Sequence, residues 1–96
     1  MSCSLSTHVL DTAAGRPAGG VAIELLREGV AVAAAETDAD GRARLADDLE
    51  AGAYSLVFHP PSPFFTRVEL QVELAEGHYH VPLLVSPFGC ASYRGS

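Results

Sequence analysis

The chain has 96 residues, 48% of them hydrophobic, which is enough for one folded domain spanning residues 1–96 with a modest core. Twelve acidic side chains against six arginines and no lysine give a formal charge of −6, which argues against nucleic-acid and anionic-membrane partners. The apolar runs are too short to cross a membrane, no signal peptide is evident, and Cys3 and Cys90 are expected to be free thiols, so we expect a cytoplasmic protein.

The first half of the chain predicts short strands separated by turns. In residues 3–10, Leu5, Thr7 and Val9 face one way and His8 faces the other. Residues 38–41, Asp-Ala-Asp-Gly, predict a turn because Asp opens such turns and Gly accepts positive φ. Further strands are predicted over residues 21–25, 30–37 and from 42 to 45, with a loop over 11–20 and either a helical turn or a plain loop over 46–52.

The second half contains the most regular alternation. A strand over residues 54–58 is ended by the prolines of residues 60–63. In residues 68–74 the aliphatic side chains share one face and the polar side chains share the other. A turn at 75–77 leads into a last strand over 78–86. Turn signals at intervals of about ten residues predict an all-β sandwich.

The last predicted strand separates two kinds of side chain. Tyr79 and Val81 share the face expected to line the core, and His78 and His80 lie on the opposite face. Pro82 shares the histidine face and usually marks an edge or a break in strand pairing. Together with His8, the pattern predicts histidines from two strands on the outer surface of the sandwich.

Three segments carry a specific pattern. Residues 5–11 are Leu-Ser-Thr-His-Val-Leu-Asp, followed by Gly-Arg-Pro at 15–17; residues 37–42 are Thr-Asp-Ala-Asp-Gly-Arg; residues 78–84 are His-Tyr-His-Val-Pro-Leu-Leu, with Tyr-Arg-Gly-Ser at 93–96. In this order they resemble the transthyretin-like 5-hydroxyisourate hydrolases. The resemblance covers most of the chain and implies a transthyretin-like (prealbumin-like) two-sheet β-sandwich. Relatives carry a longer segment with a short helix where this chain has residues 59–63, so we expect that helix to be shortened or lost.

The resemblance implies an enzyme of urate degradation, which is part of purine metabolism. Such hydrolases open the ring of 5-hydroxyisourate at an amide bond and yield 2-oxo-4-hydroxy-4-carboxy-5-ureidoimidazoline. Matched position by position, catalytic roles are implied for His8, Arg42 and His80, and substrate contacts for His8, Arg42, Tyr93, Arg94, Gly95 and Ser96. We expect no cofactor and no metal.

The resemblance also implies a homotetramer, a dimer of dimers. Pro82 and Leu84 on the histidine face are apolar groups that a single chain would leave exposed, which agrees with assembly.

The residue types suit hydrolysis by direct attack of water. An imidazole titrates near neutral pH and can take a proton from water, whereas a guanidinium stays charged and can polarise the attacked carbonyl. We favour His80 as the base and His8 as its orienting partner, a choice that the sequence leaves open. No nucleophile elbow is present, which argues against an acyl-enzyme.

Plainer interpretations exist for the same residues. A lone strand histidine is more often a surface side chain, and His78 with His80 could form a metal pair, although no third ligand is evident. His59, before the prolines, is interpreted as structural or solvent-facing. Residues 21–58 also resemble non-catalytic sandwich modules attached to carboxypeptidases, and a transthyretin-like carrier would share the fold. Neither alternative needs the His-Tyr-His strand or the Tyr-Arg-Gly-Ser segment.

Overall fold

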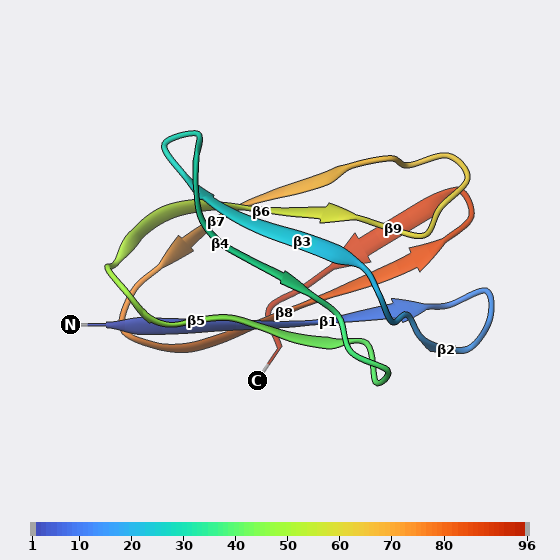
Figure 1. Ribbon diagram of the computed structural model, residues 1–96, viewed down its shortest axis with the longest axis horizontal. Helices are drawn as coiled ribbons and strands as arrows, with labels where there is room; N and C mark the ends of the chain where they lie inside the picture. Colours follow the sequence, from blue (N-terminus) through green and yellow to red (C-terminus); the bar gives the residue numbers. More distant parts are fainter. Residues whose placement is uncertain (1, 96) are drawn as a thin grey trace.

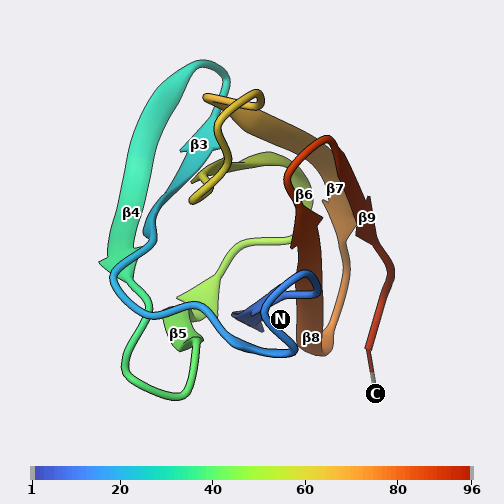
Figure 2. The same cartoon turned by 90° about the vertical axis from the view of Figure 1, so that its right-hand side faces the viewer.

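Two β-sheets packed face to face make up residues 2–95, the part of the chain that the computed structural model describes (Figures 1 and 2). The first sheet has the order β2 (Arg16–Pro17), β1 (Cys3–Asp11), β8 (Gly77–Ser86) and β9 (Gly89–Ser92), and β5 (Arg42–Leu49) also pairs with β1. The second sheet has the order β4 (Val30–Glu36), β3 (Ala22–Arg27), β6 (Gly52–His59) and β7 (Val68–Leu74). This architecture confirms the predicted two-sheet sandwich.

The core lies between the sheets and follows the predicted alternation. Leu5 and Val9 on β1 and Leu83 on β8 are fully buried, and they belong to the same apolar cluster as Leu56 and Phe58 of the second sheet. Burial of these side chains is the main favourable contribution to folding. The faces predicted for residues 3–10, 68–74 and 78–86 are therefore confirmed.

β1 organises the outer surface of the first sheet. It runs parallel to β8, so that Ser6 lies opposite His80 and His8 lies opposite Pro82. It runs antiparallel to β5, which places Arg42 opposite His8. Because paired residues project from the same side of a sheet, these side chains gather on one face of the molecule.

β5 is longer than expected. Residues 46–49 belong to this strand, so the helical turn or plain loop predicted over residues 46–52 is wrong for most of that segment. The acidic, helix-tolerant sequence is overridden by pairing with β1, in which Cys3 lies opposite Leu49 and Leu5 opposite Ala46 across local register shifts.

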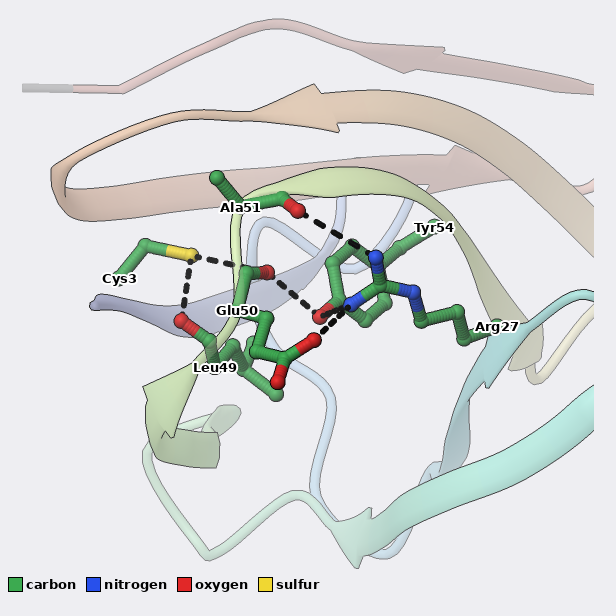
Figure 3. A network of polar contacts seen from close by, with 6 residues as sticks. All are labelled: Cys3, Arg27, Leu49, Glu50, Ala51 and Tyr54. Carbon is green, nitrogen blue, oxygen red and sulfur yellow. Dashed lines mark hydrogen bonds and ion pairs between the residues drawn. The ribbon is translucent and has the colours of Figure 1, made fainter. Parts of the chain in front are cut away.

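The turn that follows β5 connects the two sheets and is fixed by a polar network (Figure 3). The Tyr54 hydroxyl donates to the Glu50 carbonyl at 2.7 Å, and Arg27 donates to the Tyr54 hydroxyl at 2.8 Å. Arg27 also donates to the Ala51 carbonyl at 3.3 Å, and the Cys3 thiol approaches the Leu49 carbonyl at 3.4 Å. This network lies among β1, β3 and β6 and holds β5 in register without using the histidines.

The segment 60–67 joins β6 to β7 without helical structure, and residues 2–95 contain no helix at all. The family's short helix is therefore lost, as predicted. No helix in the described residues is long and apolar enough to cross a membrane. Cys3 is buried, Cys90 is exposed, and the two thiols are not paired.

Candidate active site

The turn over residues 38–41 positions the start of β5. The Asp38 carboxylate accepts hydrogen bonds from the backbone N–H groups of Asp40 at 2.9 Å and Arg42 at 3.0 Å. Gly41 has a φ of 75°, and a Cβ built there would lie 2.5 Å from the Val9 carbonyl oxygen, so the turn requires glycine for both conformation and space. Arg42 thereby enters β5 directly opposite His8.

The same turn fixes the ring of His8. Its Nε2 lies 2.9 Å from the backbone carbonyl of Asp40. Because a carbonyl oxygen can only accept, Nε2 carries the proton, and in the neutral ring Nδ1 is the unprotonated acceptor. His8 therefore offers the surface a lone pair, while its other nitrogen is held by the backbone.

His80 is half-buried at the centre of the outer face. The backbone N–H of Gly95 donates to its carbonyl at 2.6 Å, so the segment after β9 crosses beside it. A Cβ built on Gly95 would lie 2.9 Å from Cδ2 of the His80 ring. The glycine therefore lets the backbone lie directly against the imidazole.

Pro82 explains why this segment is not a continuous strand. Pairing of β9 with β8 ends where Ser92 lies opposite Leu83, and the bridge between His80 and Gly95 resumes in the same register. Pro82 lies between these pairs and has no N–H to donate, although its carbonyl accepts from the Ser92 hydroxyl at 2.8 Å. Of the two possibilities that the sequence left open at Pro82, an edge or a break in pairing, the structure shows a break on the β9 side, while pairing with β1 continues.

This register separates the two side chains that precede Gly95. Arg94 lies opposite Val81, and its guanidinium sits 4.2 Å from the centroid of the Tyr79 ring, on the core-facing side of β8. It is thus not brought together with the histidines in this chain. Tyr93 lies opposite Pro82, on the histidine side, and its side chain is exposed. Ser96, the last residue of the predicted set, lies outside the described residues.

Two serines of β1 bind the two histidines of β8. The Ser6 hydroxyl lies 2.8 Å from Nδ1 of His80 and 3.0 Å from Nε2 of His78. The Ser4 hydroxyl lies 2.6 Å from Nδ1 of His78. Every ring nitrogen of His78 and one of His80 is therefore in contact with a hydroxyl group.

The electrostatic surroundings favour a neutral His80. Burial, followed by the charges of His8, Arg42 and His78, lowers the pKa of His80 below its ordinary value of 6.5. The ring is consequently an unprotonated base at neutral pH. Residues 2–95 contain no group of three or more His, Cys, Asp or Glu side chains that could hold a metal ion.

Two features were missed by the sequence reasoning. Ser4 and Ser6 alternate with the buried residues of β1 and so share a face with His8, a signal that the period-two pattern already contained. The contact of His8 with the Asp40 carbonyl could not be found this way, because it depends on how β5 pairs. His59 lies elsewhere, with Nε2 3.1 Å from a Glu24 carboxylate oxygen on the second sheet.

Comparison with known proteins gives one consistent result. The family model described as the HIUase/Transthyretin family matches residues 5–95. The 5-hydroxyisourate hydrolase of Caulobacter vibrioides is 40% identical, over 96% of this chain and 97% of the relative. The structure of Klebsiella pneumoniae 5-hydroxyisourate hydrolase is 40% identical, with a TM-score of 0.89 and full coverage of both chains. Sea bream transthyretin, solved in complex with thyroxine, is 29% identical, with a TM-score of 0.83 over 95% of this chain and 93% of that one.

Proposed function

The chain belongs to the HIUase/Transthyretin family, and on that premise we propose that it hydrolyses 5-hydroxyisourate at the outer face of its first sheet. It is a hydrolase of urate degradation, and its substrate is a small molecule. The observation that carries the assignment to this face is that three adjacent strands bring Arg42, His8 and His80 to it: Arg42 lies opposite His8, and His80 lies two residues from the partner of His8 on β8. A non-catalytic module would have no need of this grouping.

In the proposed reaction, water attacks the amide carbonyl of the substrate ring. His80 takes a proton from the water, since burial and nearby cations keep its imidazole neutral. The Arg42 guanidinium stabilises the negative charge that develops on the carbonyl oxygen. His8 accepts a hydrogen bond from a ring N–H through Nδ1, because Nε2 is committed to the Asp40 carbonyl. Arg42 and His8 thus bind and orient, and His80 moves the proton.

The segment after β9 completes the proposed site from the other side. Gly95 supports the His80 ring, and the Tyr93 hydroxyl hydrogen-bonds a substrate oxygen. Arg94 acts within this chain by holding the segment against Tyr79 rather than by touching substrate. A substrate contact for Ser96 remains part of the proposal on the strength of the sequence resemblance alone.

We also propose a homotetramer that is a dimer of dimers. Pro82 is buried and Leu84 half-buried within one chain, so neither supplies the apolar surface that the sequence suggested. The exposed rings of Phe64, Phe88 and Tyr93 supply it instead. Light scattering is expected to give about four times the chain mass of 10.0 kDa. A fully active single chain would contradict this part of the proposal.

A cytoplasmic location is proposed as well. The unpaired thiols of buried Cys3 and exposed Cys90 support it, because unpaired thiols are more typical of reducing compartments. Fractionation of the native host, probed with an antibody to the protein, tests the location, and recovery outside the cytoplasm would contradict it.

The function is tested by generating 5-hydroxyisourate with urate oxidase and following its ultraviolet decay. Added protein is expected to accelerate the decay, with the same rate after treatment with a chelator. The His80→Ala variant, matched by His59→Ala on the second sheet, controls for histidine surface chemistry. Unchanged decay with intact folded protein would contradict the proposed function.

A further inference from the structure

We propose that Ser6 and His78 form a proton relay between His80 and solvent. The relay rests on the proposed hydrolysis, because it serves the base of that reaction. Ser6 and His78 touch no substrate in this scheme and act through His80. They are therefore positioning residues that also carry a proton.

The geometry is a ladder between β1 and β8. Ser4 lies opposite His78, and Ser6 lies opposite His80. Three short contacts follow one another along this ladder. They join His80 Nδ1 to the Ser6 hydroxyl at 2.8 Å, the Ser6 hydroxyl to His78 Nε2 at 3.0 Å, and His78 Nδ1 to the Ser4 hydroxyl at 2.6 Å. Each is within normal hydrogen-bonding range. The contacts form an unbroken path from the site to the exposed end of the ladder.

Two arrangements of protons satisfy this path. In the first, His80 Nδ1–H donates to Ser6, Ser6 donates to His78 Nε2, and His78 Nδ1–H donates to Ser4. In the second, every donor and acceptor is reversed. Only the first arrangement leaves His80 Nε2 unprotonated and able to act as a base.

The reaction converts one arrangement into the other and back. As water attacks, one of its protons binds His80 Nε2. The Nδ1 proton passes to Ser6, the Ser6 proton passes to His78 Nε2, the His78 Nδ1 proton passes to Ser4, and one Ser4 proton leaves to bulk water. When the C–N bond breaks, the His80 Nε2 proton binds the leaving nitrogen, and the ladder draws one proton back from solvent. Water supplies the hydroxyl and the hydrogen of the products, and every side chain ends as it began.

The relay would prevent positive charge from building up on His80 during the reaction. Without a relay, His80 would become an imidazolium beside the permanent positive charge of Arg42, one of the neighbours that, with burial as the largest cause, already lower its pKa. Arg44 of β5 also lies opposite Ser6, although Asp47 pairs with it. Passing the proton outward keeps His80 neutral throughout. Exposure to solvent also increases along the path away from the site, because His80 is half-buried and His78 is exposed.

A simple alternative is that Ser6 only holds the His80 ring in place. Replacing His78 separates the two roles. In His78→Gln, the side chain can still hydrogen-bond Ser6, but an amide cannot accept a proton at one atom and release it from another as an imidazole does. Holding would survive this change, whereas proton transfer would not.

The decisive experiment measures kcat and KM for 5-hydroxyisourate with Ser6→Ala, Ser6→Thr, His78→Gln and the Ser6→Ala/His78→Gln double variant. Ser6→Ala and His78→Gln are each expected to lower kcat by roughly 10-fold or more with little change in KM, part of what proton transfer contributes. The double variant should lose no more than either single variant, because both break one path. Ser6→Thr retains the hydroxyl and should restore most of kcat.

Ser86→Ala is the matched serine control. Ser86 lies at the far end of β8, where its hydroxyl donates to the Gly89 carbonyl at 3.1 Å, and it should keep the wild-type kcat. Imidazole buffer should raise kcat of Ser6→Ala while leaving the wild type unchanged. Compared with the wild type, nitrogen-15 NMR should show that Ser6→Ala alters the ring tautomers of both His78 and His80, whereas Ser86→Ala alters neither.

The outcomes separate the relay from the function. If His78→Gln keeps the wild-type kcat while Ser6→Ala loses it, Ser6 only holds the ring and the relay is overturned. Full activity in both single variants, or unlinked tautomers, also overturns it and leaves the hydrolase intact. An intact protein that never accelerates decay refutes the proposed function itself.

Discussion

The backbone of Gly95 lies against the imidazole of His80, with room for hydrogen but not for carbon: a Cβ on Gly95 would come within 2.9 Å of Cδ2 and 3.3 Å of the His80 carbonyl oxygen. Both atoms belong to the residue proposed as the base. The position of the ring thus depends on a residue that follows it by fifteen positions in the chain.

Gly95→Ala should displace either the His80 ring or the segment after β9. A shift of about 1 Å in a positioned group can cost on the order of 10²-fold in rate, so we expect kcat to fall at least 10-fold. Gly89→Ala is the matched control, because its Cβ would meet only the Ser86 hydroxyl at 3.1 Å. Melting temperatures should differ little between the two. Equal activity in both variants would mean that the ring tolerates the methyl group.

His80→Ala and Arg42→Ala should each lower turnover by roughly 10²-fold or more, since one removes the proposed base and the other the partner of the oxyanion. Both side chains lie on the outer face, so circular dichroism and the unfolding midpoint should stay close to the wild type. Steady-state decay of 5-hydroxyisourate measures the loss. A folded variant with near-normal turnover would remove that residue from the mechanism.

The pH profile of kcat/KM should have its acidic limb below 6.5. A base works when it is neutral, and burial with the charges of His8, Arg42 and His78 lowers the pKa of His80, so activity is kept as pH falls to that lowered value and lost below it. Arg42→Gln removes one positive charge and should move the limb upward, towards 6.5, on top of its loss in rate. A limb that stays in place would show that another group titrates.

The contact of Arg94 with Tyr79 should matter through the ring and the charge. Arg94→Lys and Tyr79→Phe keep a cation over an aromatic face and should retain most of kcat, whereas Arg94→Ala and Tyr79→Leu should each lower it by roughly 2- to 5-fold, equivalent to about 0.5–1 kcal/mol. The double variant should lose no more than one single variant. Loss on Arg94→Lys as large as on Arg94→Ala, with a raised KM, would instead place Arg94 against the substrate.

Much of the fold could be predicted because alternation is a local property. The inner face of β1 can be recognised from the alternation of Leu5, Thr7 and Val9 alone, without knowledge of any other strand. The same holds for Tyr79 and Val81 on β8. Residues 46–49 could not be predicted in this way, since their strand exists only through pairing with residues far away in the chain.

The same distinction between local alternation and long-range pairing applies to the site. His8 and His80 were assigned correctly to the outer face by alternation, whereas the direction of Arg94 follows from the register that the segment after β9 adopts on β8. A sequence motif gives the residues of this segment but not their sides. The Ser6 contacts were within reach of the sequence, but a serine on a strand carries no signal of its partner until β1 and β8 are known to run parallel.

The missing N–H of Pro82 also has a consequence for motion. It divides the strand formed by β9 and the segment that follows into two units, one held by the β9 ladder and one by the bridge at Gly95. The second unit can open while the first stays closed, because no continuous ladder couples them. The Gly95 amide is therefore expected to exchange with deuterium faster than the amides of β9.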